Sequence, residues 1–308
     1  LLFANNYYLS ALGSMTAPLA NRIAASKIGK KILGQIGIST YIPFPKFSFH
    51  TLRREKKSRS RGDRKVAFFY GCFINFYRPD IGRKIIRMLQ SFHIDVVLPP
   101  QVCCGLPALG NGNPALARTF AQKNVASLSN YIDAGYDIVY TCTSCGLCLL
   151  QDYQGILEIP ETKKIAENCY NLHEYLLKLI AEREIHPVFR EVNRSLAYHI
   201  PCHLRALKIG YPAADLMKRI PDLDFTILDD ACCGLSGSYG FKKTNEATAI
   251  QLGTRAASLV RKTGAEAMVA DCGSCRMQLG GLSGMDAFDP AEILCESLGI
   301  RGKKQNNA

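Results

Sequence analysis

Ten of the thirteen cysteines in this chain fall into two series that repeat along the sequence. Each series has a single cysteine, then an adjacent pair, and then two cysteines separated by two residues. Equivalent positions lie 130, 129 and 130 residues apart, and the neighbouring residues repeat too, since VCCGLP matches ACCGLS and TCTSC matches DCGSC. A repeat this long indicates two related halves. The first series is Cys72, Cys103, Cys104, Cys142 and Cys145, and the second is Cys202, Cys232, Cys233, Cys272 and Cys275.

The repeat predicts three parts in the chain. Residues 66–195 and 196–302 form two cysteine-rich domains, and residues 1–65 form a basic, helical N-terminal segment or linker. In both domains the repeated cysteines follow short runs rich in valine, isoleucine and tyrosine. Such continuous apolar runs are typical of strands that are buried on both faces of a parallel sheet. The runs, each ending in its cysteines, are 65–72, 94–105, 136–145, 195–202, 225–234 and 267–275.

Helical patterns lie between the apolar runs. The stretch 78–92 places Ile81, Ile85, Ile86 and Leu89 on one face, and the stretch 113–135 opens with a capping asparagine followed by proline. Alternating strands and helices predict an α/β fold with an open, mostly parallel sheet and flanking helices in each half. Ligands of such sheets collect beyond the carboxyl ends of the strands, so all five cysteines of one half are expected to converge there.

Five convergent thiols exceed the four ligands of a structural zinc site or of a cubane iron–sulfur cluster. One thiol is then spare, or the cluster has an unusual shape. A thioredoxin-like role for C-x-x-C explains only two of the five cysteines, and paired zinc sites remain a second alternative. Iron–sulfur ligation is the favoured interpretation of the five cysteines in each half. Gly105 and Gly234, directly after the cysteine pairs, allow a sharp turn.

Three cysteines fall outside the repeat. Cys148 extends the first C-x-x-C motif and could substitute as a ligand, whereas Cys169 and Cys295 are expected to be small buried hydrophobic residues. Three polar residues beside the repeated cysteines could hydrogen-bond cluster sulfur or offset its charge, or could have ordinary surface roles. They are His203, Arg205 and Arg276.

The positive charge is concentrated at the N-terminus. Residues 1–65 carry 13 of the 38 basic residues and only 2 of the 26 acidic ones, a net charge of +11 out of +12. Such a segment suits anionic lipid or an acidic partner, and a solvated linker is the plainer alternative. No nucleic acid partner is expected, because the basic run 53–65 contains no aromatic residue and no recognised binding module surrounds it.

Residues 1–20 carry no charged side chain, but polar residues and Pro18 interrupt this run, so no transmembrane span is expected. A packing or interfacial helix followed by an amphipathic stretch at 21–38 is predicted instead. Many cysteines without a signal peptide indicate a reducing compartment. We therefore expect a cytoplasmic protein that associates peripherally with the inner face of the cell membrane.

The doubled pattern C…CCG…C-x-x-C resembles the cysteine-rich CCG domain family, which includes the B subunits of heterodisulfide reductases. Within it the chain is most similar to the C subunits of anaerobic glycerol-3-phosphate dehydrogenases, through 65–86, 229–243 and 269–279 and more weakly through 43–54. Members of that subfamily carry two ferredoxin-like cubane motifs ahead of these domains. No cysteine precedes Cys72, and the chain begins at Leu1, so a truncated or divergent member is expected.

The resemblance implies one iron–sulfur cluster in each domain, of the 4Fe-4S type or non-cubane, with all ten repeated cysteines as ligands; zinc at one site is a lesser possibility. It also implies an electron carrier rather than a substrate-oxidising subunit. Such a subunit takes electrons from a flavoprotein dehydrogenase partner and passes them to the membrane quinone pool in anaerobic respiration. The alternatives are a catalytic subunit like that of heterodisulfide reductase and a redox subunit of lactate or glycolate oxidation.

Overall fold

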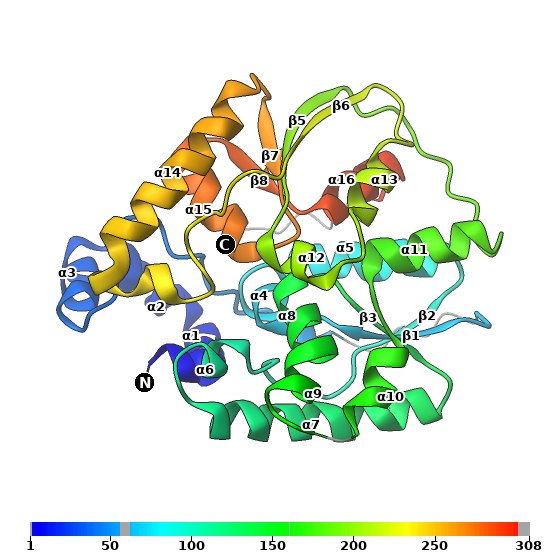
Figure 1. Ribbon diagram of the computed structural model, residues 1–308, viewed down its shortest axis with the longest axis horizontal. Coiled ribbons are helices and arrows are strands. Elements are labelled where there is room, and N and C mark those ends of the chain that lie inside the picture. The colour runs from blue at the N-terminus through cyan, green and yellow to red at the C-terminus, as the bar shows by residue number, and fades with distance from the viewer. Residues whose placement is uncertain (1, 56–61, 160, 301–308) are drawn as a thin grey trace.

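The computed structural model describes residues 2–55, 62–159 and 161–300 (Figure 1). It contains two four-stranded sheets, one in each half of the chain, and every strand pairing within them is parallel. The strand orders are β2-β1-β3-β4 and β6-β5-β7-β8. The two orders are identical when each half is numbered separately. The structure therefore confirms the predicted α/β fold and its duplication.

Both halves alternate strands with helices along the chain. The first half contains β1 (Lys65–Phe69), α4 (Gly71–Phe76), α5 (Pro79–Ser91), β2 (Asp95–Val97), α6 (Leu106–Leu109), α7 (Pro114–Asp133), β3 (Asp137–Tyr140), α8 (Thr143–Leu147), the π-helical turn η3 (Cys148–Asp152), α9 (Tyr153–Gly155), α10 (Thr162–Glu167), β4 (Cys169–Asn171) and α11 (Leu172–Ala181). The second half contains β5 (Arg194–His199), α12 (Cys202–Leu207), α13 (Pro212–Met217), β6 (Leu223–Leu228), the 3₁₀ turns η4 (Tyr239–Phe241) and η5 (Lys243–Asn245), α14 (Glu246–Lys262), β7 (Ala267–Val269), α15 (Gly273–Ser283), β8 (Asp286–Phe288) and α16 (Pro290–Ser297).

The two helices predicted in the first half are present as α5 and α7. Asn113 caps α7, because its side-chain oxygen accepts a hydrogen bond from the Leu116 amide at 3.1 Å. The fourth strand of each sheet was not predicted. β4 (CYN) and β8 (DAF) lack the continuous apolar run that marked the other strands, including the equally short β2 and β7.

Burial on both faces is confirmed for most of the predicted strands but is wrong for β6. The side chains of β1 after Lys65, and all those of β7, are buried. β6 instead has partly buried and exposed side chains along its length. It forms one edge of the second sheet, and the equivalent edge strand β2 of the first sheet is mostly buried.

The two halves share one hydrophobic core. It includes Phe68 of β1 and Leu176 of α11 from the first half together with Tyr198 of β5 and Leu294 of α16 from the second. Figure 1 shows α5 and α11 in the middle of the molecule, below α13 and α16. Because the halves bury apolar surface against each other, their sheets are held in a defined relative position.

The N-terminal segment is helical, as predicted, and contacts both halves. It contains η1 (Phe3–Asn5), α1 (Asn6–Met15), α2 (Ala17–Ala25), α3 (Lys27–Gln35) and η2 (Leu52–Arg54). The stretch 21–38 is not one helix, because the chain breaks at Ser26, whose hydroxyl caps α3. Ser10 lies 2.8 Å from the Tyr77 hydroxyl of the first half, and Ile38 forms an antiparallel bridge with Lys242 of the second. Residues 56–61 of the basic run lie outside the described residues.

No helix in the described ranges combines the length and the apolar character needed to cross a membrane. This finding agrees with the expectation from the sequence, where polar residues and Pro18 interrupt the uncharged run. Pro18 lies in the first turn of α2, where its missing amide hydrogen costs nothing, so the uncharged run is divided between two short helices.

Glu292 of α16 provides an ionic contact between the halves, and its loss is expected to destabilise the fold. Its carboxylate accepts hydrogen bonds from Arg78 at 2.9 Å and Lys84 at 3.2 Å, and its side chain is only 7% exposed. Glu292→Gln keeps the shape but removes the charge, and should lower the free energy of unfolding by about 2 kcal/mol. Urea denaturation measures this. The control is Glu167→Gln, at an exposed pair with Lys163, which should change the free energy of unfolding by less than about 0.5 kcal/mol. Equal changes in the two variants would show that the contact of Glu292 between the halves does not stabilise the fold.

Candidate metal centres

The repeated cysteines lie at the carboxyl ends of the strands, as predicted. In the first half, Cys72 follows β1 in α4, the adjacent pair follows β2, and Cys142 follows β3 at the N-cap of α8. In the second half, Cys202 begins α12 after β5, and Cys272 is the N-cap of α15 after β7. The short helices α4, α8 and α12 meet in the middle of the molecule (Figure 1). Parallel pairing brings these strand ends to one edge of each sheet.

The five repeated thiols of each half interact with one another in a continuous chain of neighbours. The order in the first half is Cys72, Cys103, Cys104, Cys145 and Cys142. The order in the second half is Cys202, Cys232, Cys233, Cys275 and Cys272. The two orders match, because each cysteine of the first chain of thiols is equivalent in the repeat to the cysteine at the same place in the second. The fold therefore brings together, in both halves, thiols that are about 70 residues apart in the sequence.

These thiol contacts favour thiolates at particular positions. Hydrogen bonds from the thiols of Cys103, Cys145 and Cys148 hold the pKa of Cys104 well below its usual range. In the second half, hydrogen bonds from Cys202 and Cys233 likewise lower the pKa of Cys232. Because metals bind the thiolate form, these clusters of sulfur are chemically suited to metal ligation.

The thiols are not arranged around one point. Among the described residues, which include all thirteen cysteines, no three Cys, His, Asp or Glu side chains form a group that could hold a single metal ion. Four thiolates on one zinc ion, with bonds of about 2.3 Å, would lie only about 3.8 Å from one another on all sides. Open chains of five thiols suit a cluster of several metal atoms better, because its ligands bind at separate corners.

The glycines after the cysteine pairs make the turn that was predicted. Gly105 and Gly234 have φ angles of +103° and +83°, in the left-handed region that glycine adopts easily. The Gly105 amide donates to the Cys103 sulfur at 3.5 Å, and the Gly234 amide donates to the Cys232 sulfur at 3.4 Å. Each turn thus directs a backbone N–H group at the first sulfur of its pair.

Two polar residues that the sequence analysis missed hold the first cysteine pair in place. The Gln101 side chain accepts a hydrogen bond from the Gly71 amide at 3.1 Å and donates to the Phe68 carbonyl at 3.1 Å. Asn124 of α7 is fully buried; it accepts from the Val102 amide and donates to the Cys103 carbonyl, both at 2.9 Å. A polar residue on the apolar face of the predicted helix was the signal that could have identified Asn124.

Cys148 belongs to the first group of thiols, whereas Cys169 and Cys295 are buried, as expected, outside the two thiol chains. The Cys148 thiol contacts that of Cys104 and donates to its carbonyl oxygen at 3.2 Å. The position equivalent to Cys148 in the second half is Gln278, which donates to the Ala249 carbonyl at 3.0 Å. The first group therefore has six thiols and the second has five.

The two groups of thiols face each other across the boundary between the halves. Ser144, between the cysteines of the first C-x-x-C motif, lies 3.7 Å from the Cys272 sulfur and 2.7 Å from Nδ1 of His203. At the equivalent contact, where the second C-x-x-C motif meets the first half, the Phe73 ring packs closely on Gly273. A side chain at position 273 would clash with this ring. His203 was one of the polar residues expected near the sulfur, and it reaches Cys272 through Ser144.

The two arginines proposed near the sulfur bind other partners. Arg276 donates to Asp289 at 2.7 Å, and its guanidinium lies 5.4 Å from the centre of the Phe73 ring. Arg205 donates to the Asp229 carbonyl at 2.7 Å. Arg276 is thus part of the contact between the halves, and Arg205 braces the loop that leads from β6 to the second cysteine pair.

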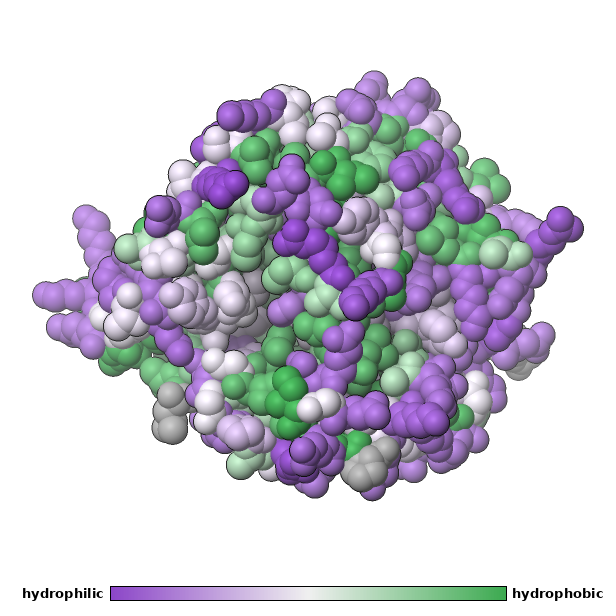
Figure 2. All heavy atoms as spheres, viewed as in Figure 1, coloured by the Kyte–Doolittle hydropathy of each residue, from purple (hydrophilic) through white to green (hydrophobic). Residues whose placement is uncertain are grey.

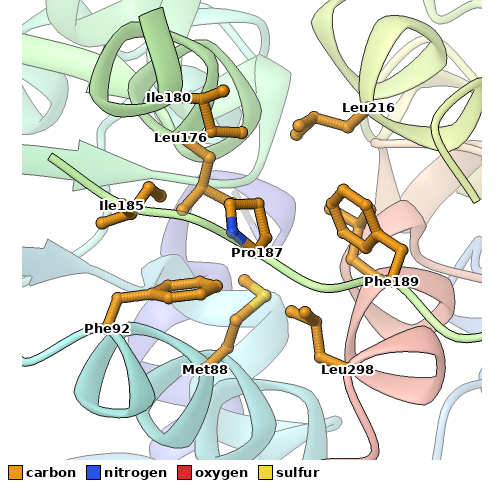
Figure 3. A pocket seen from close by; sticks show the side chains of 10 residues that line it. Met88, Phe92, Leu176, Ile180, Ile185, Pro187, Phe189, Leu216 and Leu298 are labelled. Atoms are coloured by element: carbon orange, nitrogen blue, oxygen red, sulfur yellow. The ribbon is translucent and has the colours of Figure 1, made fainter. Parts of the chain in front are cut away.

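An apolar cavity between the halves is separate from the cysteines (Figure 3). It encloses about 10 Å³, close to the minimum for one water molecule, so it cannot hold a cofactor. Its lining comes from α5, α11, α13, α16 and the linker between the halves, and consists of Met88, Phe92, Leu176, Ile180, Ile185, Pro187, Phe189, Leu216, Leu294 and Leu298. On the face shown in Figure 2, apolar side chains are visible among hydrophilic ones over the middle of the molecule.

Two parallel sheets, each with five linked thiols at the carboxyl edge, define a protein built from duplicated cysteine-rich domains. The chain belongs to the cysteine-rich domain family known as CCG, which it matches over residues 66–151 and 196–280. These two matches cover the first three strands of each sheet and all ten repeated cysteines, and they end before β4 and β8.

Proteins similar to this chain include subunits of a dehydrogenase and of a reductase and a lactate utilization protein. The chain is 29% identical to the subunit named C of the anaerobic glycerol-3-phosphate dehydrogenase of Escherichia coli, over 95% of this chain and 77% of that one. It is 29% identical to the subunit named B of the fumarate reductase (CoM/CoB) of Methanothermobacter marburgensis, over 70% of this chain and 41% of that one. It is 28% identical to lactate utilization protein A of Bacillus pumilus, over 70% of this chain and 91% of that one.

The turn at Gly234 is expected to tolerate no side chain. A Cβ atom there would lie 2.8 Å from the Ala249 carbonyl oxygen and 2.9 Å from the Gly253 amide nitrogen, both backbone atoms of α14. Gly234→Ala should therefore lower the free energy of unfolding by about 3 kcal/mol or more, measured in urea. Gly264→Ala is the control, because Gly264 has a φ of +70° but open space around it. This control should lower the free energy of unfolding by only about 1–2 kcal/mol. Equal losses of stability in the two variants would show that the contact with α14 is unimportant.

Proposed function

We propose that the protein is an iron–sulfur electron-transfer subunit in which each half holds one cluster through its five repeated cysteines. The observation that carries this proposal is the chain of neighbouring, interacting thiols, which meet in the same order at the same edge of both sheets. Thiolates are the common protein ligands of iron–sulfur clusters, and five per site exceeds what a zinc ion requires. The family and a relative described only as an iron–sulfur protein support this choice.

The chain's own residues supply the ligands and their surroundings. The ten repeated cysteines bind as thiolates, and the amides of Gly105 and Gly234 donate to sulfur. Gln101 and Asn124 hold the first cysteine pair in place. A bound cluster, of the 4Fe-4S type or non-cubane, supplies one-electron chemistry. Zinc at one site is the lesser alternative, because five thiols exceed the four ligands of a structural zinc ion.

The proposed partners are a flavoprotein dehydrogenase subunit and the membrane quinone pool. The Escherichia coli and Methanothermobacter relatives are both named as subunits, of a dehydrogenase and of a reductase, so each works with other chains. We propose that this chain likewise receives electrons from a flavin-containing subunit and passes them on in anaerobic respiration. The substrate of that partner subunit would by analogy be glycerol 3-phosphate.

The N-terminal helices offer a surface suited to the cytoplasmic face of the membrane. Ile28 is 73% exposed and Leu19 is 62% exposed, and no acidic residue occurs before Glu55. Exposed apolar side chains interleaved with lysines suit the interface of an anionic lipid bilayer. The exposed apolar residues of this surface are Leu12, Met15, Leu19, Ile23, Ile28, Ile32 and Ile36, and its basic residues are Arg22, Lys27, Lys30 and Lys31.

Metal analysis tests the iron–sulfur proposal directly. Anaerobically purified protein should contain several iron atoms with matching sulfide, and should give an EPR signal before or after mild oxidation. Cys103→Ser and Cys232→Ser should each remove about half of the iron, because each variant disables one of two sites. Two buried cysteines outside the thiol chains provide the controls: Cys169→Ala and Cys295→Ala should retain the iron. Zinc without iron would contradict the electron-transfer proposal.

Binding to lipid vesicles tests the membrane proposal. The protein should bind vesicles with a quarter anionic lipid more tightly than neutral ones, and added salt should weaken this binding. Replacing Lys27, Lys30 and Lys31 together by glutamine should reduce the affinity on the order of a hundredfold, since each basic residue near an anionic surface contributes about 1 kcal/mol. Vesicle flotation measures the bound fraction.

A charge-matched variant controls for net charge. Replacing Lys163, Arg183 and Lys218 by glutamine removes three exposed basic residues from other parts of the molecule and should leave vesicle affinity nearly unchanged. Equal losses in the two triple variants would show that net charge, and not the N-terminal surface, drives the binding.

A further inference from the structure

Ser144 connects the two groups of thiols. It lies between Cys142 and Cys145 of the first half, yet its hydroxyl oxygen is 3.7 Å from the Cys272 sulfur of the second half. On its other side the same hydroxyl is 2.7 Å from Nδ1 of His203, the residue after Cys202. A side chain in the first turn of α8, within the first C-x-x-C motif, thus contacts a proposed ligand of the other domain.

The hydrogens available fix the direction of these bonds once Cys272 is a thiolate. A serine hydroxyl has one hydrogen to donate, and a thiolate sulfur has none. Ser144 must then donate to the Cys272 sulfur, and His203 must donate its Nδ1 hydrogen to the Ser144 oxygen. The short contact with His203 therefore orients the Ser144 hydroxyl toward sulfur. In agreement with this direction, Ser144 is among the groups that lower the pKa of Cys272, after the larger effect of Cys275.

The equivalent contact between the second C-x-x-C motif and the first half lacks a histidine beside its serine. Ser274 is equivalent to Ser144, and Phe73 is equivalent to His203. The Phe73 ring packs on Gly273, beside Ser274, and a hydrocarbon ring has no nitrogen with which to orient a hydroxyl group. The duplication has therefore kept the thiols and the serine in both halves but provides the orienting histidine in only one.

We propose that Ser144, oriented by His203 as a positioning residue, donates a hydrogen bond to the Cys272 ligand and raises the reduction potential of the second site. This inference rests on the proposed iron–sulfur function. Hydrogen bonds to ligand sulfur draw negative charge away from a cluster and so stabilise its more negative, reduced form. Because the donor lies in the first turn of α8, between Cys142 and Cys145, the potential of the second site depends on the structure of the first.

A redox titration followed by EPR, on the full chain with both sites loaded, tests this proposal. The signal that disappears in Cys232→Ser identifies the second site. Ser144→Ala should lower the midpoint potential of that signal by an amount equal to about a tenfold change in the reduction equilibrium, or 59 mV for one electron. The first-site signal should not move. Ser144→Thr keeps the hydroxyl and should restore most of the potential.

The duplicated sequence provides matched controls. Ser274→Ala removes the equivalent hydroxyl and should leave both potentials unchanged. His203→Phe introduces the residue of the other half and should lower the second-site potential in the same direction as Ser144→Ala. If Ser144→Ala and Ser274→Ala shift the potentials equally, or if neither does, this inference is overturned while the iron–sulfur function stands. If the wild-type protein holds no cluster, the proposed function itself fails.

Discussion

Parallel pairing of the strands around a shared core is the constraint on which the rest of this structure depends. In a parallel sheet every strand ends at the same edge, so the residues after β1, β2 and β3 become neighbours whatever their distance in the chain. Burial of apolar surface between α5, α11, α13 and α16 then fixes one sheet relative to the other. The thiols meet, and the two groups of thiols face each other, because of these two effects together.

The duplication has kept the sulfur atoms and changed what surrounds them. Five thiols follow the same order in each half, and both cysteine pairs end in a glycine turn whose amide donates to sulfur. The supporting residues differ: Asn124, which binds the first cysteine pair, corresponds to Gly253, where Gln278 fills the space instead. At the two proposed sites, equal cysteines in unequal surroundings are expected to give clusters with different properties, because the surroundings of a metal site tune it as its ligands do.

The N-terminal segment has a different character from the rest of the chain. Its helices contact both halves, through Ser10 and Ile38, while many of their apolar side chains stay exposed beside lysines. A segment that served only to complete the core would bury those side chains. The proposed membrane surface, which consists of these exposed apolar and basic residues, therefore lies on the part of the chain that contacts both domains.

The sequence by itself determined the duplication, the parallel α/β class and the ten repeated cysteines, because spacing and hydrophobic runs are properties of the chain alone. It also indicated the glycine turns and the cap of α7. The tertiary structure alone decided the order in which the thiols meet, the inclusion of Cys148 in the first group, and the contact of Ser144 with Cys272. These depend on the packing of one half against the other and of helices against loops, and such long-range contacts leave no periodic signal in the sequence. The strands β4 and β8 escaped prediction because their sequences, CYN and DAF, contain a polar residue within three positions and form no apolar run.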